Sequence, residues 1–103
     1  MESENNMIKF SDADKKKYIQ ASVNKVFAML GVYEDCQKIN DFENFYRYVK
    51  RLLYEFTGAY NILKVESLIS LLGVIEGIYN DKGITHSEVR SLTFHCISIL
   101  KKE

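Results

Sequence analysis

Apolar residues recur every three or four positions along four stretches of the chain, the spacing that places them on one face of an α-helix. These stretches cover residues 11–31, 40–58, 61–80 and 85–102. The sequence contains no proline, which permits long uninterrupted helices and disfavours a turn-rich β fold. We therefore predict an all-α fold, a compact four-helix bundle.

The stretch 61–80 differs from the other three because its apolar residues cover about two thirds of the helix circumference, whereas an ordinary surface helix has one stripe a little over 100° wide. Lys64, Glu66 and Glu76 interrupt it, so it lacks the uninterrupted apolar span of about 18 residues that suggests a membrane helix. We predict that this third helix is the central and most buried one in a bundle that does not enter a membrane.

Small residues form a line on the remaining side of this stretch. Ser70, Gly73 and Gly77 follow one another at a spacing of three or four. Each glycine in a helix interior costs about 0.5–1 kcal/mol relative to alanine, so two on one line suggest that another backbone approaches closely. The backbone would belong to a neighbouring helix or to a second copy in a homodimer. The alternative is a tolerated weak position that faces solvent.

The predicted helix boundaries rest on capping patterns. A capping residue is followed three positions later by an acidic one in the pairs Ser11–Asp14, Asn40–Glu43 and Thr85–Glu88. Gly31 and Gly58 stand where helices are expected to end, which leaves residues 32–39 as a connection. Leu72 lies midway along the third helix and is expected to be a core residue.

The 103 residues suffice for one domain, and 47% hydrophobic content is typical of a globular protein. We expect a flexible leader over residues 1–10 and a single helical domain over 11–103. The leader lacks a signal-peptide pattern, so we expect a cytoplasmic protein in which Cys36 and Cys96 are free thiols. Basic and acidic residues balance at 14 each, which disfavours binding to nucleic acid through many phosphates.

Residues that could carry catalysis or bind a metal are sparse. His86 and His95 are nine positions apart, which places them on opposite sides of one helix, and no CxxC or HxxxH motif is present. No nucleophile stands with a base on a recognisable turn, and no glycine-rich phosphate loop occurs. We therefore predict a protein that is not an enzyme and that has no metal site and no cofactor.

The most specific cluster is Arg47, Lys50, Arg51 and Tyr54, on the side of the second helix opposite its apolar stripe. Two of the three arginines of the chain stand here, although lysine is its usual basic residue. Arginine and tyrosine are enriched in binding hot spots, and a guanidinium pairs well with carboxylates. The same side chains can stack on bases and contact phosphates, and a merely solvated face is the third interpretation.

These observations favour a small protein-binding module whose partner presents an acidic patch. Bacteriocin immunity proteins and many small phage proteins share this size and helical class, which suggests an immunity, inhibitor or regulatory protein of a bacterial or phage system by analogy of fold alone. The alternative is a nucleic-acid-binding accessory protein that uses the Arg/Tyr face of the second helix. A homodimer is also predicted, from the small line of the third helix and from Phe94 and Ile97, which lie off the apolar stripe of the fourth.

Overall fold

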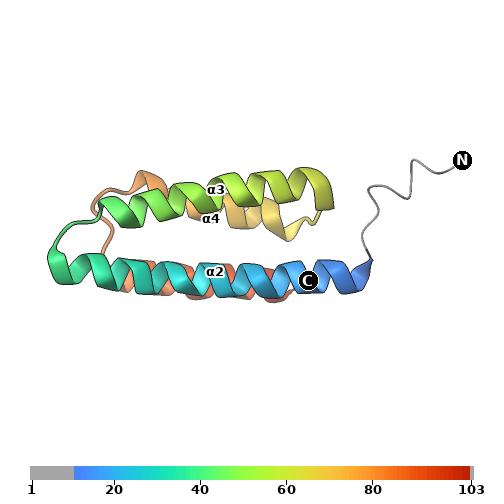
Figure 1. Ribbon diagram of the computed structural model, residues 1–103, viewed down its shortest axis with the longest axis horizontal. Helices are drawn as coiled ribbons and strands as arrows, with labels where there is room; N and C mark the ends of the chain where they lie inside the picture. The colour runs from blue at the N-terminus through green and yellow to red at the C-terminus, as the bar shows by residue number, and fades with distance from the viewer. Residues whose placement is uncertain (1–10, 103) are drawn as a thin grey trace, which may run out of the picture.

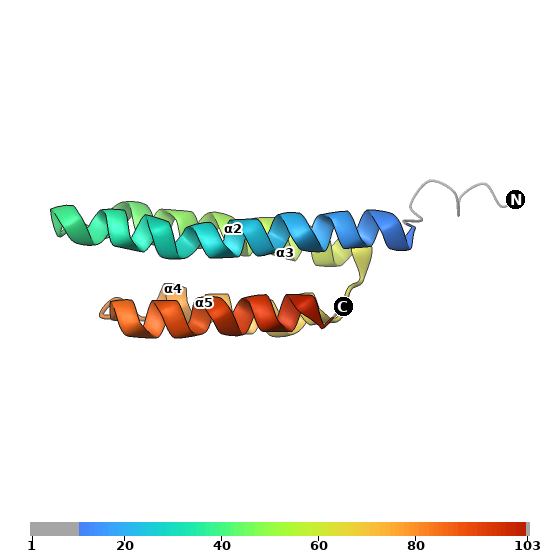
Figure 2. The ribbon, with the colours of Figure 1, turned by 90° about the horizontal axis from the view of Figure 1, so that it is seen from below.

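Four helices pack in a ring in the computed structural model, which describes residues 11–102 (Figure 1). They are α2 (Asp12–Ile39), α3 (Glu43–Leu63), α4 (Ser67–Asn80) and α5 (His86–Lys101). Each helix packs on the one before it and the one after it, and α5 closes the ring against α2. Figure 2 shows α2 and α5 side by side, with α3 and α4 behind them. The predicted all-α four-helix bundle is confirmed, whereas the predicted leader 1–10 lies outside the described residues.

The core lies along the axis of this ring and receives one apolar stripe from each helix. The largest fully buried side chains come from all four helices: Met29, Phe45, Leu52, Phe56, Leu68, Leu71, Ile75, Ile78 and Leu100. Each fully buried side chain of this kind stabilises the fold by about 1.5–3 kcal/mol relative to exposure. Within residues 11–102, no helix is long and apolar enough to cross a membrane.

The third helix, α4, is shorter than predicted and occupies a corner of the ring. It begins at Ser67, because residues 61–63 belong to α3, and it contacts α3 and α5 but not α2. Five of its 14 residues are buried, against four of 21 in α3, so it does bury the largest share of its length. A helix at a corner still keeps an outer side, which is why Leu71 is fully buried while Leu72 is only half-buried.

The first helix runs eight residues further than predicted, through Gly31 to Ile39. The reason is that Tyr33 and Cys36 continue its buried stripe beyond the glycine. Asn40 is the left-handed residue that ends this helix, with φ 53°, rather than the residue that begins the next one. The region 32–39 is therefore helical, and the prediction of a connection there was wrong.

The second helix also passes its predicted end at Gly58 and stops at Leu63. Lys64 ends it in the left-handed region, with φ 55°, and its amide donates to the carbonyl of Tyr60 at 2.9 Å. No described glycine has a positive φ, so neither Gly31 nor Gly58 serves as a helix terminator. Glycine was a misleading stop signal because helical backbone also accepts it, at a modest cost.

Two of the predicted capping boxes are present. The Ser11 hydroxyl accepts from the Asp14 amide at 3.1 Å, and the Asp14 carboxylate accepts in return from the Ser11 amide. Thr85 and Glu88 form the same reciprocal pair at the start of α5. The box predicted at Asn40 does not form, because α3 starts at Glu43 with no side-chain cap.

Candidate functional site

The Arg/Tyr face, defined as Arg47, Lys50, Arg51 and Tyr54, lies on the outer side of α3, and all four side chains are exposed. The opposite side of the helix points into the core through Phe45, Val49, Leu52 and Phe56. Residues at positions i, i+3, i+4 and i+7 share one side of a helix, so the burial of that stripe directs the Arg/Tyr face outward. The structure therefore brings the four predicted residues together on one surface.

The two arginines of this face have different surroundings. The Arg47 guanidinium donates to Glu43 at 2.9 Å and to Asn44 at 3.1 Å, both on the preceding turn of α3. Within residues 11–102, Arg51 has no hydrogen bond and no ion pair. The guanidinium of Arg51 can therefore pair with an incoming carboxylate without first breaking such a contact.

Tyr54 differs from three other tyrosines, whose hydroxyls hold segments of the bundle together. Those hydroxyls donate to backbone carbonyls, from Tyr33 to Ile84 at 2.8 Å, from Tyr46 to Asp81 at 2.6 Å and from Tyr48 to Lys25 at 2.7 Å. The Tyr54 side chain is 71% exposed, and its hydroxyl has no partner among the described residues. Tyr54 is therefore the large aromatic side chain that contributes least to holding the bundle together.

A groove of about 450 Å³ joins this face to α4. It is lined by Lys50, Leu53, Tyr54, Thr57, Glu76, Tyr79 and Asn80. Two members of the Arg/Tyr face, Lys50 and Tyr54, thus line a hollow together with the apolar side chain of Leu53. Sequence reasoning did not find the α4 side of this groove, because the lateral contact of two helices cannot be read from the periodicity of either one.

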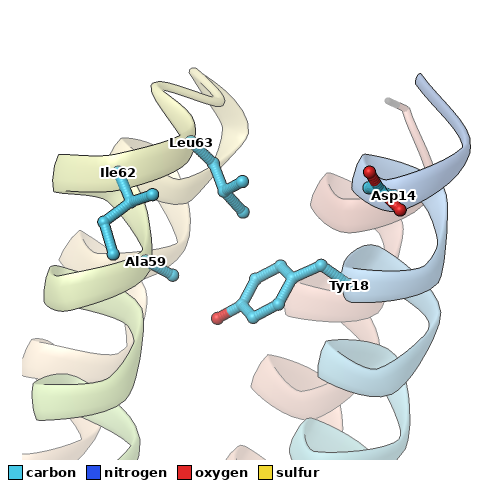
Figure 3. Close-up of a pocket in the computed structure, with 5 residues that line it drawn as sticks. All are labelled: Asp14, Tyr18, Ala59, Ile62 and Leu63. Carbon is cyan, nitrogen blue, oxygen red and sulfur yellow. The ribbon is translucent and has the colours of Figure 1, made fainter. Parts of the chain in front are cut away.

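A second hollow, of about 520 Å³, lies between the start of α2 and the end of α3 (Figure 3). Its lining is mostly apolar, with Tyr18 facing Ala59 and Ile62 across it, and Asp14 at its edge. Burial raises the pKa of Tyr18, which keeps its hydroxyl neutral. This hollow was not predicted, because the second helix was expected to end before Ala59.

Within residues 11–102, the two glycines of the small line of α4 have no close neighbour from another helix. Ser70, Gly73 and Gly77 are all exposed, and a Cβ added at either glycine would meet no described atom within 4 Å. Among the described helices, none approaches Gly73 or Gly77 closely, contrary to the interpretation of close packing within the chain. Contact with a second copy along this line stays a prediction.

The histidines and cysteines do not assemble into a reactive centre. His86 contacts Glu34 at 2.9 Å, and among the described residues no group of three or more potential ligands could hold a metal ion. Both cysteines are buried free thiols. Burial raises the pKa of Cys96 from 9.0 to about 12, so its thiolate is strongly disfavoured.

No protein-family model, curated protein or solved structure matches the chain.

Proposed function

We propose that this chain is a non-enzymatic protein-binding module that recognises an acidic patch on its partner through the Arg/Tyr face of α3. The observation that carries the proposal is that Arg51 and Tyr54 lie about one helical turn apart on this face. Neither side chain has a polar partner in the described part of the chain, and both are exposed. Exposed side chains that make no contact within the fold are available to bind a partner.

The chemistry of the two side chains suits such a partner. The guanidinium of Arg51 offers a planar fork that can hold a carboxylate through two parallel hydrogen bonds. The ring of Tyr54 offers a large contact area at low entropic cost, because it has few rotatable bonds. The adjoining groove, which Leu53 helps to line, can take an apolar side chain of the partner next to its carboxylates.

The remaining basic residues of the face support the same specificity. Lys50 stands at the edge of the groove, and Arg47 is already paired with Glu43. We expect Lys50 to steer an acidic partner toward the face rather than to dominate the affinity. Arg47 should contribute less than Arg51, since a new carboxylate must compete with the Glu43 pair.

We also propose a biological role for this module. An immunity, inhibitor or regulatory role in a bacterial or phage system would fit a small helical module of this kind, and such a protein would act in the cytoplasm. The support is its size and its helical class. Its natural neighbours in the genome would indicate which partner to test.

The test uses a partner captured on the immobilised chain and then purified. Its dissociation constant is measured by calorimetry for the natural chain, for Tyr54→Ala and for Arg51→Ala. Each substitution should weaken binding by about 2 kcal/mol if the residue is a hot spot. Ile62→Ala is the matched control, because Ile62 is also exposed on α3 but faces the hollow beside α2. Equal affinity of all variants would overturn the proposal.

A salt titration separates a protein partner from a nucleic acid. The same face could stack Tyr54 on a base and place Arg51 on a phosphate. Binding to a generic DNA duplex or single strand would then fall steeply as salt rises, because counterions are released from the phosphates. With 14 basic and 14 acidic residues, we expect no measurable DNA binding at physiological salt. Tight DNA binding lost in Arg51→Ala would replace the protein partner with a nucleic acid.

A further inference from the structure

Phe27 of α2 and Phe94 of α5 form an exposed aromatic pair between the two helices that lie in front in Figure 2. Their ring centroids are 6.0 Å apart, and the side chains are 53% and 47% exposed. The sequence pattern predicted that Phe94 lies off the apolar stripe of its helix, and the side chain is indeed exposed. Two adjacent exposed phenylalanines form an apolar patch of the kind that marks an interaction site.

Shallow hollows flank this aromatic pair on both helices. On α2 the hollow measures about 480 Å³, and its lining includes the small residues Ala28 and Gly31. On α5 it measures about 430 Å³, and its lining includes Ser87 and Ser91. A Cβ added at Gly31 would meet no described atom within 4 Å, so the surface is open there. The face thus combines two exposed rings with adjacent hollows that can receive side chains of a binding partner.

Opposite charges stand on the two sides of the pair. Glu34 lines the α2 hollow, and Arg90 lines the α5 hollow with its guanidinium 5.9 Å from the Phe94 ring. Because α2 and α5 run antiparallel, both residues lie toward the same end of the bundle from the rings, by about 10 Å and 6 Å at 1.5 Å per residue. Arg90 has no ion pair within residues 11–102, and the Glu34 side chain is still 48% exposed although it contacts His86 at 2.9 Å.

We infer that this face binds a second copy of the chain, with a two-fold axis parallel to the helices. Such an axis leaves the position of each residue along the bundle unchanged. It places α2 of one copy against α5 of the other. Phe27 of each copy then meets Phe94 of the other, and Arg90 of each copy meets Glu34 of the other. The two-fold symmetry therefore brings opposite charges together at two places in the interface. Because the net charge of the chain is zero, two copies do not repel each other through their overall charge.

This arrangement goes beyond the proposed function, because it uses the layer of the bundle opposite the α3–α4 groove. The dimer would leave both Arg/Tyr faces exposed and directed away from the two-fold axis. A partner with two acidic patches, or an oligomeric partner, could then engage both copies at once, which raises the overall affinity without new contacts.

The first experiment measures mass by sedimentation velocity across micromolar concentrations. The natural chain should reach twice its 12.0 kDa monomer mass. Phe27→Ser/Phe94→Ser should dissociate roughly 30-fold more readily, the effect of losing hot-spot residues. Ile69→Ser is the matched control, since Ile69 is equally exposed on α4, and it should leave the dimer intact. A monomer mass at every concentration overturns the inference, as does a dimer that survives the loss of both phenylalanines.

A charge exchange tests the two-fold arrangement itself, and it uses exposed residues so that folding is retained. Arg90→Glu alone and Glu34→Arg alone should each weaken the dimer by roughly tenfold or more, because each puts like charges face to face. The double variant Arg90→Glu/Glu34→Arg should recover most of the affinity. Circular dichroism melting confirms that each variant is folded. A folded double variant that is as weak as the single variants overturns the proposed pairing, as does a dimer lost only in Gly77→Leu on the α4 line.

Discussion

The Tyr33 hydroxyl donates a 2.8 Å hydrogen bond to the carbonyl of Ile84 and so joins the last turns of α2 to the segment before α5. Both residues are buried, so water cannot replace the contact. We predict that Tyr33→Phe lowers the free energy of unfolding by about 1–2 kcal/mol, because the Ile84 carbonyl is left without its partner. Urea titration measures the change. An unaltered midpoint would mean that the contact contributes nothing to stability.

Leu71 and Leu72 provide a direct comparison within α4. Leu71 is fully buried, while Leu72 is only half-buried on the corner helix. We predict that Leu71→Ala costs about 2–5 kcal/mol of stability and that Leu72→Ala costs clearly less. Denaturant unfolding of both variants decides the order. A larger loss at Leu72 would mean that α4 is rotated from its described position.

Lys64 ends α3 in the left-handed backbone region, at φ 55°, where a side chain is disfavoured. We predict that Lys64→Gly stabilises the fold by about 0.5–1 kcal/mol, because glycine adopts this conformation without steric cost. The gain is offset in part by the loss of the Lys64 ammonium from above the Tyr60 ring. Thermal melting of the variant measures the balance. A lower melting temperature would show that the lysine contact outweighs the backbone strain.

Stability should fall in alkaline solution. Burial raises the pKa of Cys96 from 9.0 to about 12, and it also raises the pKa of Tyr33 and Tyr48 above 10.0. These groups release protons in the unfolded chain at a lower pH than in the folded one, so the unfolded state gains as pH rises. The stability is complete below pH 9 and declines between about pH 9 and pH 12. Urea midpoints at pH 7, 9 and 10.5 test this, with Cys96→Ala expected to reduce the early part of the loss.

Much of the fold follows from apolar periodicity, because each of the four helices must bury one face. The all-α class and the four helices within residues 11–102 could be predicted for this reason, and the capping patterns predicted the starts at Ser11 and Thr85. The helix ends could not, because Gly31 and Gly58 are tolerated inside helices while Asn40 and Lys64 adopt the left-handed conformation. Local residue preferences are weak beside the free energy of burying Tyr33 and Cys36 on a longer helix.

The arrangement of the helices around the core was not predictable from any one of them. Residues 61–80 were predicted to form a central helix because their apolar side chains cover most of its circumference. The observed α4 nevertheless keeps an outer side, on which Ile69 is exposed. The outward position of Arg47, Lys50, Arg51 and Tyr54 did follow from the opposite apolar stripe of their helix. The groove beside α4 and the pairing of Phe27 with Phe94 depend on contacts between helices, which one sequence does not specify.

The most direct test of the proposed binding function changes Arg47 and Arg51 together to alanine. Lys16→Ala/Lys17→Ala is the matched control, because it also removes two exposed positive charges, from the first turns of α2. Both double variants should melt within a few degrees of the natural chain, since exposed ion pairs contribute only about 0–1 kcal/mol.

The measurement is the dissociation constant of the captured acidic partner for both double variants, obtained by calorimetry at one salt concentration. We predict that Arg47→Ala/Arg51→Ala weakens binding by about 2 kcal/mol or more and that Lys16→Ala/Lys17→Ala changes it little. Equal losses in the two variants would show that only overall charge matters. Unchanged binding by a folded Arg47→Ala/Arg51→Ala variant would contradict the account, because the partner would then be recognised through another surface.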